Sequence, residues 1–133
     1  MSAETAVPQW VHDYVKDWRD RLLLTPWKIR LRLQDIIDGD ENILAQVHLF
    51  QEVQTANITF RGDISPEPSD EWQQTILHEL MHVRLAEVSE FVRDDIIPEL
   101  GPTAERVAQA AFRRALEPAV EGLAHVLWAL AQE

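Results

Sequence analysis

Two histidines and a glutamate near the middle of the chain have the types and the spacing of a site that binds a metal ion. His78 and His82 are four residues apart in a segment with strong helical character. On a helix this spacing sets the side chains about 40° apart around the axis, with Cβ atoms roughly 5–6 Å apart, so both imidazoles can reach one metal ion. Glu79 lies about 100° round from His78. That is a poor position for a third ligand but a good one for accepting a proton from a metal-bound water.

The helix that carries these residues is expected to extend from about Asp70 to at least Ala86. Ser69 or Asp70 can cap its first turn. Its residues on the face opposite the histidines are apolar: Trp72, Ile76, Leu80 and Val83. We expect that face to pack against a sheet and to leave the histidines facing a cleft. The alternative is a chance arrangement of two surface histidines and a solvated glutamate, as with any short motif. The apolar surroundings of the motif and the absence of proline within it favour the metal site.

The segment from Thr75 to Val83 resembles the zincin metallopeptidases, whose core is a His-Glu-x-x-His helix behind a small sheet. The remaining chain follows the zincin order of helix, strands and helices only loosely. Arg84 departs from the family, which usually has an apolar residue at this point. The metzincin branch would need glycine and histidine where the chain has Leu85 and Val88. With an acidic pair at Glu117 and Glu121, the chain resembles the compact, gluzincin-like domains found in microbial and phage genomes.

This resemblance implies a third ligand on a later helix, because gluzincins take a glutamate from there, often with a second acid four residues on. Glu117 and Glu121 offer such a pair. The apolar face that follows them comprises Leu123, Val126, Leu127 and Leu130. In the gluzincin pattern the first acid binds the metal and the second supports it, which implies Glu117 as the ligand beside His78 and His82. Glu121 remains the alternative, because Pro118 disfavours helical geometry at Glu117.

Other readings of these acids stay open at this point. Glu117 could cap a final helix that begins at Pro118, and Glu121 could lie on a solvated helix face. The remaining acids of this part of the chain compete less well. Glu87 points away from His78, Glu105 has no acid four residues later, and four more surround an expected turn: Glu90, Asp94, Asp95 and Glu99.

The other histidines have no metal-binding spacing to one another. His12, His48 and His125 are therefore interpreted as surface or core residues, although His125 follows Glu121 by four residues and could support the site. Tyr14 is the only tyrosine and belongs to the first helix, so no donor for stabilising an oxyanion is identified.

Composition limits the classes of function. The chain has 133 residues, enough for one domain, and we expect a single domain over residues 1–133. It has no cysteine, so a zinc site must use histidine and carboxylate, the donor set of catalytic sites. The net charge of −11 argues against nucleic-acid binding. No membrane-spanning stretch and no signal peptide at residues 1–5 are expected, which makes cytoplasm the expected location.

Local patterns predict an α+β fold with an N-terminal helix, a small three-stranded sheet, the motif helix and C-terminal helices. Residues 8–24 have an apolar stripe at every fourth position. Three segments alternate between apolar and polar residues and are expected to be strands: 27–33, 45–50 and 55–60. Thr103 is expected to cap a helix to about Leu116, and Pro118 to open or kink a final one.

The expected function is that of an enzyme, a zinc metallopeptidase with Zn²⁺ as cofactor and a protein or peptide as substrate. Glu79 would act as general base and then as general acid. The resemblance implies that the substrate lies along an edge strand, near residues 55–60. The alternative is a metal-binding regulatory or interaction module with little or no turnover. The oligomeric state is not indicated by the sequence.

Overall fold

The computed structural model describes residues 7–133, and residues 1–5, to which the signal-peptide expectation applies, lie outside that range. The described part has the expected α+β layout of helix, strands and helices. Its elements are α1 (Gln9–Arg21), β1 (Lys28–Gln34), β2 (Ala45–Phe50), the 3-10 turn η2 (Gln51–Val53), β3 (Thr55–Arg61), α2 (Asp70–Arg84), α3 (Ala86–Phe91), the π-helical turn η3 (Val92–Ile96), the 3-10 turn η4 (Ile97–Leu100) and α4 (Pro102–Ala131).

The sheet is mixed, with strand order β1-β3-β2. β3 is parallel to β1 and antiparallel to β2. The register aligns the apolar positions of the three strands in rows, for example Leu31 with Ile58 and Ile58 with Val47. Because side chains of a strand alternate between faces, these rows give the sheet one apolar face.

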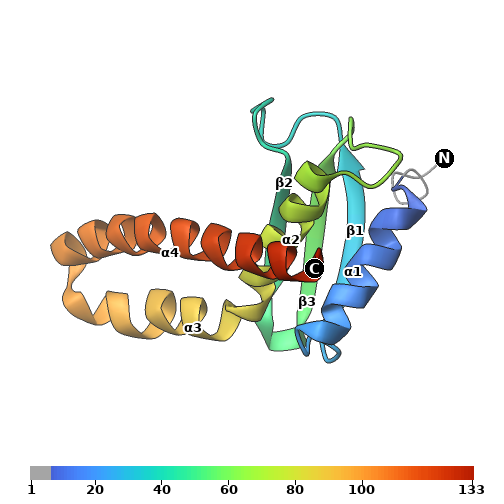
Figure 1. Ribbon diagram of the computed structural model, residues 1–133. Coiled ribbons are helices and arrows are strands. Elements are labelled where there is room, and N and C mark those ends of the chain that lie inside the picture. The colour runs from blue at the N-terminus through green and yellow to red at the C-terminus, as the bar shows by residue number, and fades with distance from the viewer. Residues whose placement is uncertain (1–6) are drawn as a thin grey trace.

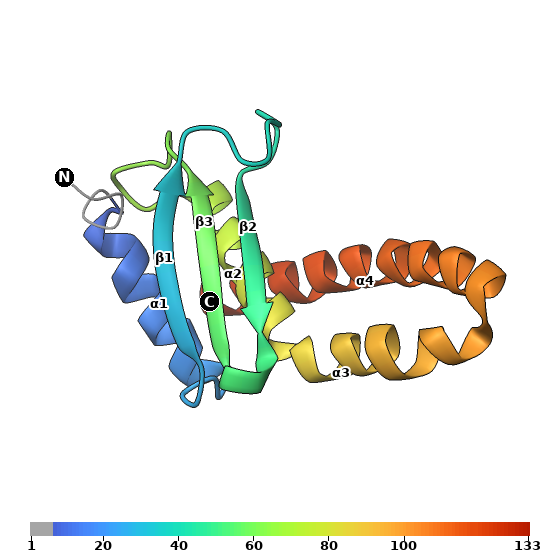
Figure 2. The same ribbon diagram turned by 180° about the vertical axis from the view of Figure 1, so that it is seen from behind.

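That apolar face is covered by α1 and α2, which lie side by side on it (Figures 1 and 2). The buried core between the sheet and these helices includes Val11, Trp18, Ile58, Phe60 and Leu80. The expected strands and the expected first helix are confirmed within a few residues at their ends. The apolar stripe of the first helix and the alternation of the three strands therefore located the elements that support the motif helix.

α2 begins and packs as the sequence predicts. The Ser69 side chain accepts a hydrogen bond from the backbone N–H of Trp72 at 3.3 Å, which caps the first turn. The predicted apolar face is buried throughout: Trp72, Ile76, Leu80 and Val83. The helix ends at Arg84, slightly earlier than expected, and the chain changes direction at Leu85 before α3 begins.

Residues 86–115, which we call the arm, form a helical hairpin that projects away from the sheet. α3, η3 and η4 lead outward, and the first half of α4 returns (Figure 1). The second half of α4 continues along α2, with Val120 and Ala124 buried in the core. The arm and the sheet thus lie on either side of α2, where the histidines are.

α4 is one continuous helix, so the expectation that one helix ends near Leu116 and that Pro118 opens another is wrong, whereas the alternative of a kink at Pro118 stays a prediction. Pro118 lies inside the helix, where it removes one backbone hydrogen bond at a cost of about 3 kcal/mol. Packing of the following turns on α2 offsets that cost. The helix also begins at Pro102 after Gly101, without a side-chain cap, so Thr103 does not cap it. Among the described residues, no helix is both long enough and apolar enough to cross a membrane.

The apolar face that the sequence indicates on the last part of α4 is only partly buried. Leu123, Val126 and Leu130, which belong to that face, are about half exposed. The stripe that packs on α2 instead contains Val120 and Ala124, with Leu116 and Leu127 at its margins. Small side chains at the contact allow two helices to approach closely, and this contact decides which face of α4 is buried.

Candidate functional site

The two motif histidines lie on the face of α2 that is turned toward α4 and away from the core. Their ring centroids are 5.1 Å apart, and their side chains are 19% and 17% exposed. The apolar residues on the opposite face fix the rotation of α2 about its own axis, because burying them against the sheet leaves only this face for the histidines. The predicted orientation of His78 and His82 is therefore confirmed.

Glu117 on α4 meets both histidines. One carboxylate oxygen, Oε2, lies 3.3 Å from Nε2 of His78, and the other, Oε1, lies 3.1 Å from Nε2 of His82. One ligand atom from each of these three residues can be chosen so that all lie within 4.8 Å of one another. This is the geometry of a group that could hold a metal ion. It also excludes the interpretation of Glu117 as a helix cap, because Glu117 is in the interior of α4.

Glu121, one turn after Glu117, contacts a different atom of the same histidine. Its Oε2 lies 2.5 Å from Nδ1 of His78, which is a short hydrogen bond. The two acids that the sequence left as alternatives therefore occupy distinct positions: Glu117 at the Nε2 atoms and Glu121 behind one ring. Hydrogen bonding of the second ring nitrogen fixes the orientation and the tautomer of a histidine.

The buried stripe of α4 explains why this acidic pair faces the histidines. Val120 and Ala124 pack against α2, and Glu117 and Glu121 lie within about 60° of Ala124 around the helix axis. Both carboxylates therefore emerge beside the helix contact, on the side of the histidines.

Glu79 is buried, with 7% of its surface exposed, and it borders the same cleft as the histidines. Burial raises the pKa of its carboxyl to about 7; the charge of His78 opposes this, and the charges of Glu117 and Glu121 add to it. Burial also lowers the pKa of His82, against the effect of Glu117, and the positive charges of His78 and Arg93 lower it further. The carboxyl of Glu79 is thus easily protonated for a glutamate.

In the metal-free protein, we expect Glu79→Gln to increase the free energy of unfolding, and to increase it more at pH 8 than at pH 5. The pKa of about 7 in the folded chain exceeds the ordinary value of 4.5. Between these values the unfolded chain loses its proton while the folded chain keeps it. Wild-type stability should therefore fall by about 1–3 kcal/mol as the pH rises through this window, and the uncharged amide should avoid that fall.

Urea unfolding of both chains in the presence of a chelator, at pH 5 and at pH 8, measures this difference. A gain of equal size at the two pH values, or no gain at all, would contradict the account of Glu79 as a buried, easily protonated carboxyl.

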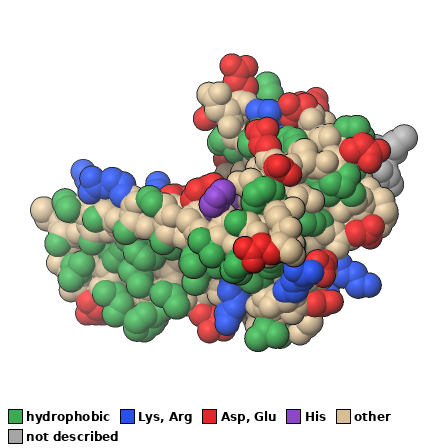
Figure 3. Space-filling model, in the orientation of Figure 1, with side chains coloured by type: hydrophobic (Ala, Val, Ile, Leu, Met, Phe, Trp, Pro, Cys, Tyr) green, Lys and Arg blue, Asp and Glu red, His purple; other side chains and the backbone are tan. Residues whose placement is uncertain are grey.

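A cleft of about 590 Å³ opens between β2 and the arm, and its lining includes the two histidines, Glu79 and Glu117. One wall is the strand β2, from Ala45 to Leu49, with Ile43 just before it. The hollow between the arm and the rest of the molecule is visible in Figure 3. The predicted cleft in front of the histidines is therefore present.

The strand beside this cleft is not the one expected. Residues 55–60 were expected to be an edge strand, but they form β3, which lies in the centre of the sheet between β1 and β2. Ala56, Ile58, Thr59 and Phe60 are accordingly buried. β2 is the edge strand beside the site, because the chain inserts β3 between the two earlier strands. A substrate that pairs with an edge strand would therefore pair with β2.

The opposite wall consists of five arm residues and Leu116, which directly follows the arm in α4, and sequence analysis did not connect this wall with the site. The arm residues are Glu90, Arg93, Gln109, Phe112 and Arg113. Of these residues, sequence analysis considered only Glu90, as a competing metal ligand. Glu90 is not among the three residues whose donor atoms converge, His78, His82 and Glu117. These residues belong to two segments that are far apart in sequence, and no fixed spacing links them to the motif.

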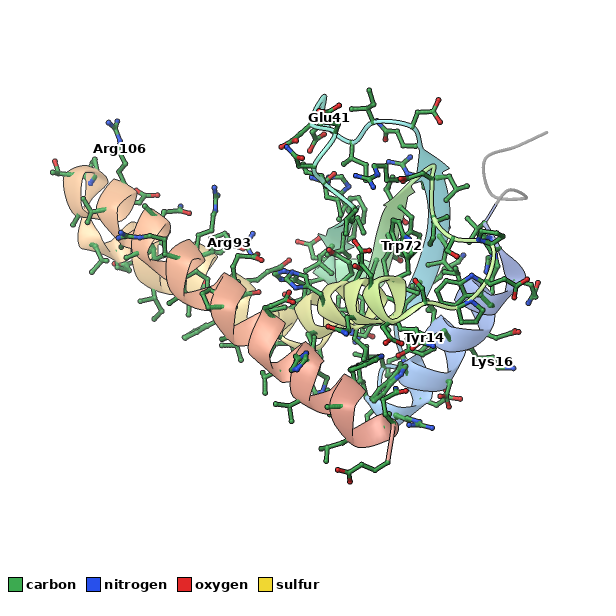
Figure 4. All side chains as sticks on the ribbon, turned by 45° about the horizontal axis from the view of Figure 1, so that its top comes forward. Tyr14, Lys16, Glu41, Trp72, Arg93 and Arg106 are labelled. Carbon is green, nitrogen blue, oxygen red and sulfur yellow. The ribbon has the colours of Figure 1, made fainter. Side chains whose placement is uncertain are left out.

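The remaining histidines and the tyrosine also have defined places. His48 is exposed on β2 and lines the cleft. His125 faces Gln74, with 3.4 Å between its Nδ1 and the amide oxygen, and does not support His78. Tyr14 is on α1, among core residues and away from the cleft lining (Figure 4).

Comparison with known proteins adds no further information about this site. No protein-family model, no curated protein and no solved structure significantly matches the chain. The functional argument therefore depends on the geometry and the chemistry of the residues themselves.

Proposed function

We propose that this protein is a zinc-dependent peptidase in which His78, His82 and Glu117 hold the metal and Glu79 transfers protons. The observation that carries the proposal is the convergence of two imidazole nitrogens and one carboxylate from α2 and α4 at the bottom of a cleft. Two histidines and a glutamate are the donor set of catalytic zinc sites, which leave a fourth position open.

Two contacts of Glu117 have the spacing of ligand pairs at zinc. In a tetrahedral site with zinc–ligand distances of about 2.0–2.1 Å, two ligand atoms are about 3.3 Å apart. Oε2 of Glu117 lies 3.3 Å from Nε2 of His78, and Oε1 lies 3.1 Å from Nε2 of His82. With one donor atom taken from each residue, the three atoms lie within 4.8 Å of one another, so a bound zinc ion would draw them closer together. An ion at the centre of this group would face the cleft.

The hydrogen bonding of His78 also supports a cation at this position. A neutral imidazole has one donor and one acceptor nitrogen. If Nδ1 donates to Glu121, then Nε2 is an acceptor that faces the carboxylate of Glu117, also an acceptor. A metal ion between these atoms resolves the repulsion. A second proton on the ring would also do so, and metal analysis of the purified protein distinguishes the two.

When bound, zinc would supply Lewis-acid chemistry: it lowers the pKa of water and polarises a carbonyl group. The protein itself would contribute the proton transfers. Glu79 can accept a proton from the attacking water and then donate it to the leaving amine. Glu121 would hold the ring of His78 in place through Nδ1.

The substrate would lie along β2, as an extended peptide that adds a strand to the exposed edge of the sheet. β2 lines the cleft, and its outer edge has no neighbouring strand among the described residues. Backbone hydrogen bonds from β2 would bring a peptide bond past Glu79 and the histidines. Peptides and flexible protein segments are therefore the expected substrates.

A second candidate function is a metal-binding interaction module with little or no turnover. It is favoured by the exposed apolar side chains that gather on the arm (Figure 3), among them Val88, Phe91, Leu100 and Val107. Such side chains are commonly covered by a partner. Cleavage of unstructured protein substrates by the zinc-loaded wild type, and not by a Glu79→Gln variant, would favour the peptidase over this alternative.

We expect one zinc ion per chain, retained through purification, and a lower melting temperature after treatment with a chelator. Free zinc at about 1,000 times its dissociation constant would add roughly 4 kcal/mol to the free energy of unfolding. Metal analysis and thermal unfolding with and without chelator measure both effects.

His78→Ala should remove the zinc, whereas His125→Ala, on α4 but facing Gln74, should retain it. The metal site would be wrong if purified protein contains no zinc, if added zinc does not bind, and if the chelator leaves the melting temperature unchanged.

A further inference from the structure

Two arginines of the arm lie in the wall of the cleft without an acidic partner. Arg93 is in η3 and Arg113 is in α4, and both line the cleft. Within residues 7–133, neither has a carboxylate oxygen within 4.0 Å, whereas Arg21 and Arg61 form ion pairs. The chain has 23 acidic residues and 12 lysines and arginines, so the two arginines make this wall of the cleft locally positive in an acidic chain.

The direction of these side chains favours a ligand in the cleft. Arg93 points into the open space between the arm and the sheet (Figure 4). The basic side chains visible along the edge of the arm that borders the hollow are arginines, since the arm contains no lysine (Figure 3). Arg93 lines the same cleft as His78 and His82. The positive charge of this wall is therefore near the candidate metal site.

None of the three carboxylates that line the cleft forms an ion pair with Arg93 or Arg113, so both guanidinium groups can bind a ligand. Glu117 is directed at the histidines, Glu79 is buried at the motif helix, and Glu90 lies on the arm but beyond ion-pair distance of both arginines. A peptide along β2 would have the strand on one side and the arm on the other. The guanidinium groups of Arg93 and Arg113 would then lie against the bound peptide.

We propose that Arg93 and Arg113 form a subsite that binds a carboxylate, so that this cleft selects peptides with an acidic side chain or a free C-terminus close to the bond at the metal site. A guanidinium group presents a planar set of donors that matches a carboxylate, and the charge-assisted pair is stronger than a neutral hydrogen bond. The peptide nature of the ligand rests on the function proposed above, whereas the preference for a carboxylate follows from the arginines.

The test measures binding of fluorescein-labelled ten-residue peptides to the zinc-loaded Glu79→Gln chain, which should bind without cleaving. One set is amidated at the C-terminus and carries a single glutamate at successive positions, with glutamine as the matched neutral residue. A second set has glutamine at each of the varied positions and a free carboxylate at the C-terminus. Fluorescence anisotropy gives the dissociation constants at two salt concentrations, and the two sets distinguish a side-chain carboxylate from a terminal one.

We expect a carboxylate at one favoured position, or at the C-terminus, to lower the dissociation constant about tenfold, which corresponds to about 1.4 kcal/mol. Salt should weaken this preference. The double change Arg93→Gln and Arg113→Gln should abolish it. The control Arg114→Gln should retain it, because Arg114 is adjacent on α4 but does not line the cleft. Arg113→Glu should turn the preference toward lysine peptides.

Equal binding of acidic and neutral peptides, no binding of any peptide, or a preference that survives loss of both arginines would overturn the subsite. The wild-type chain separates this result from the function itself. Cleavage without a preference for carboxylates would contradict the subsite alone. A carboxylate preference in binding, with no cleavage of any peptide by zinc-loaded wild type, would support the subsite and contradict the peptidase.

Discussion

Replacing Glu79 by glutamine is expected to lower the rate of peptide hydrolysis by about a hundredfold or more, with the zinc content unchanged. The amide has nearly the size of the carboxylate but cannot accept a proton from water, and general acid–base groups contribute about 10²–10⁴-fold to a rate. Glu79 is not among the three residues whose donor atoms converge, so the metal should stay in place. Cleavage of an unstructured protein and metal analysis of the same preparation measure the two quantities.

The stability of the variant makes this experiment easy to interpret. Because burial raises the pKa of Glu79 to about 7, removing the carboxyl should not destabilise the metal-free fold at neutral pH. A loss of activity could then not be attributed to unfolding. Glu87→Gln, an exposed acid on α3, is the matched control and should keep full activity. Undiminished hydrolysis by the Glu79→Gln chain would remove Glu79 from the mechanism.

Replacing Glu117 by alanine is expected to remove most of the bound zinc, whereas Glu121→Ala should weaken zinc binding by about 10–100-fold. Glu117 reaches the Nε2 atoms of both histidines, so its loss leaves only two ligands. Glu121 contacts Nδ1 of His78, and its loss frees the ring to rotate without removing a ligand. Competition with a chromophoric chelator gives the zinc affinity of each variant.

Glu105→Ala is a suitable control, because Glu105 is also on α4 but near the start of the helix and outside the cleft lining. It should bind zinc as tightly as the wild type does. Affinities in the reverse order, with Glu121→Ala the weaker binder, would transfer the ligand role to Glu121 and indicate that α4 rotates when the metal binds.

The composite nature of the cleft has a consequence for function. The histidines and Glu79 belong to a helix packed in the core, but Arg93 and Arg113 belong to an arm that extends beyond the sheet. A change of Arg93 or Arg113 should therefore alter the proposed ligand preference without removing any of the three residues that could hold the metal. In the proposed function, proton transfer depends on Glu79 in the core and ligand preference depends on the arm, so the arginine variants and the Glu79 variant are expected to have separable effects.

Sequence alone determined the features that depend on local periodicity. The apolar positions of α2 recur with helical spacing, so the direction of His78 and His82 relative to the core followed from the residues between Trp72 and Val83. Alternation located β1, β2 and β3, because the side-chain period of a strand is two. A cap at Ser69 or Asp70 was also predictable, since a cap acts within one turn, and the structure assigns that role to Ser69.

Tertiary structure alone decided which segments lie beside one another. β3 is central because it pairs with β1 on one side and β2 on the other. The alternation of residues within one strand does not indicate which strands are its neighbours. α4 passes through Pro118 because contact with α2 outweighs a local penalty of about 3 kcal/mol. The same contact buries Val120 and Ala124, exposes Leu123, and separates the positions of Glu117 and Glu121. Local signals act over a turn of helix or a pair of strand residues, whereas these outcomes depend on contacts between segments far apart in the chain.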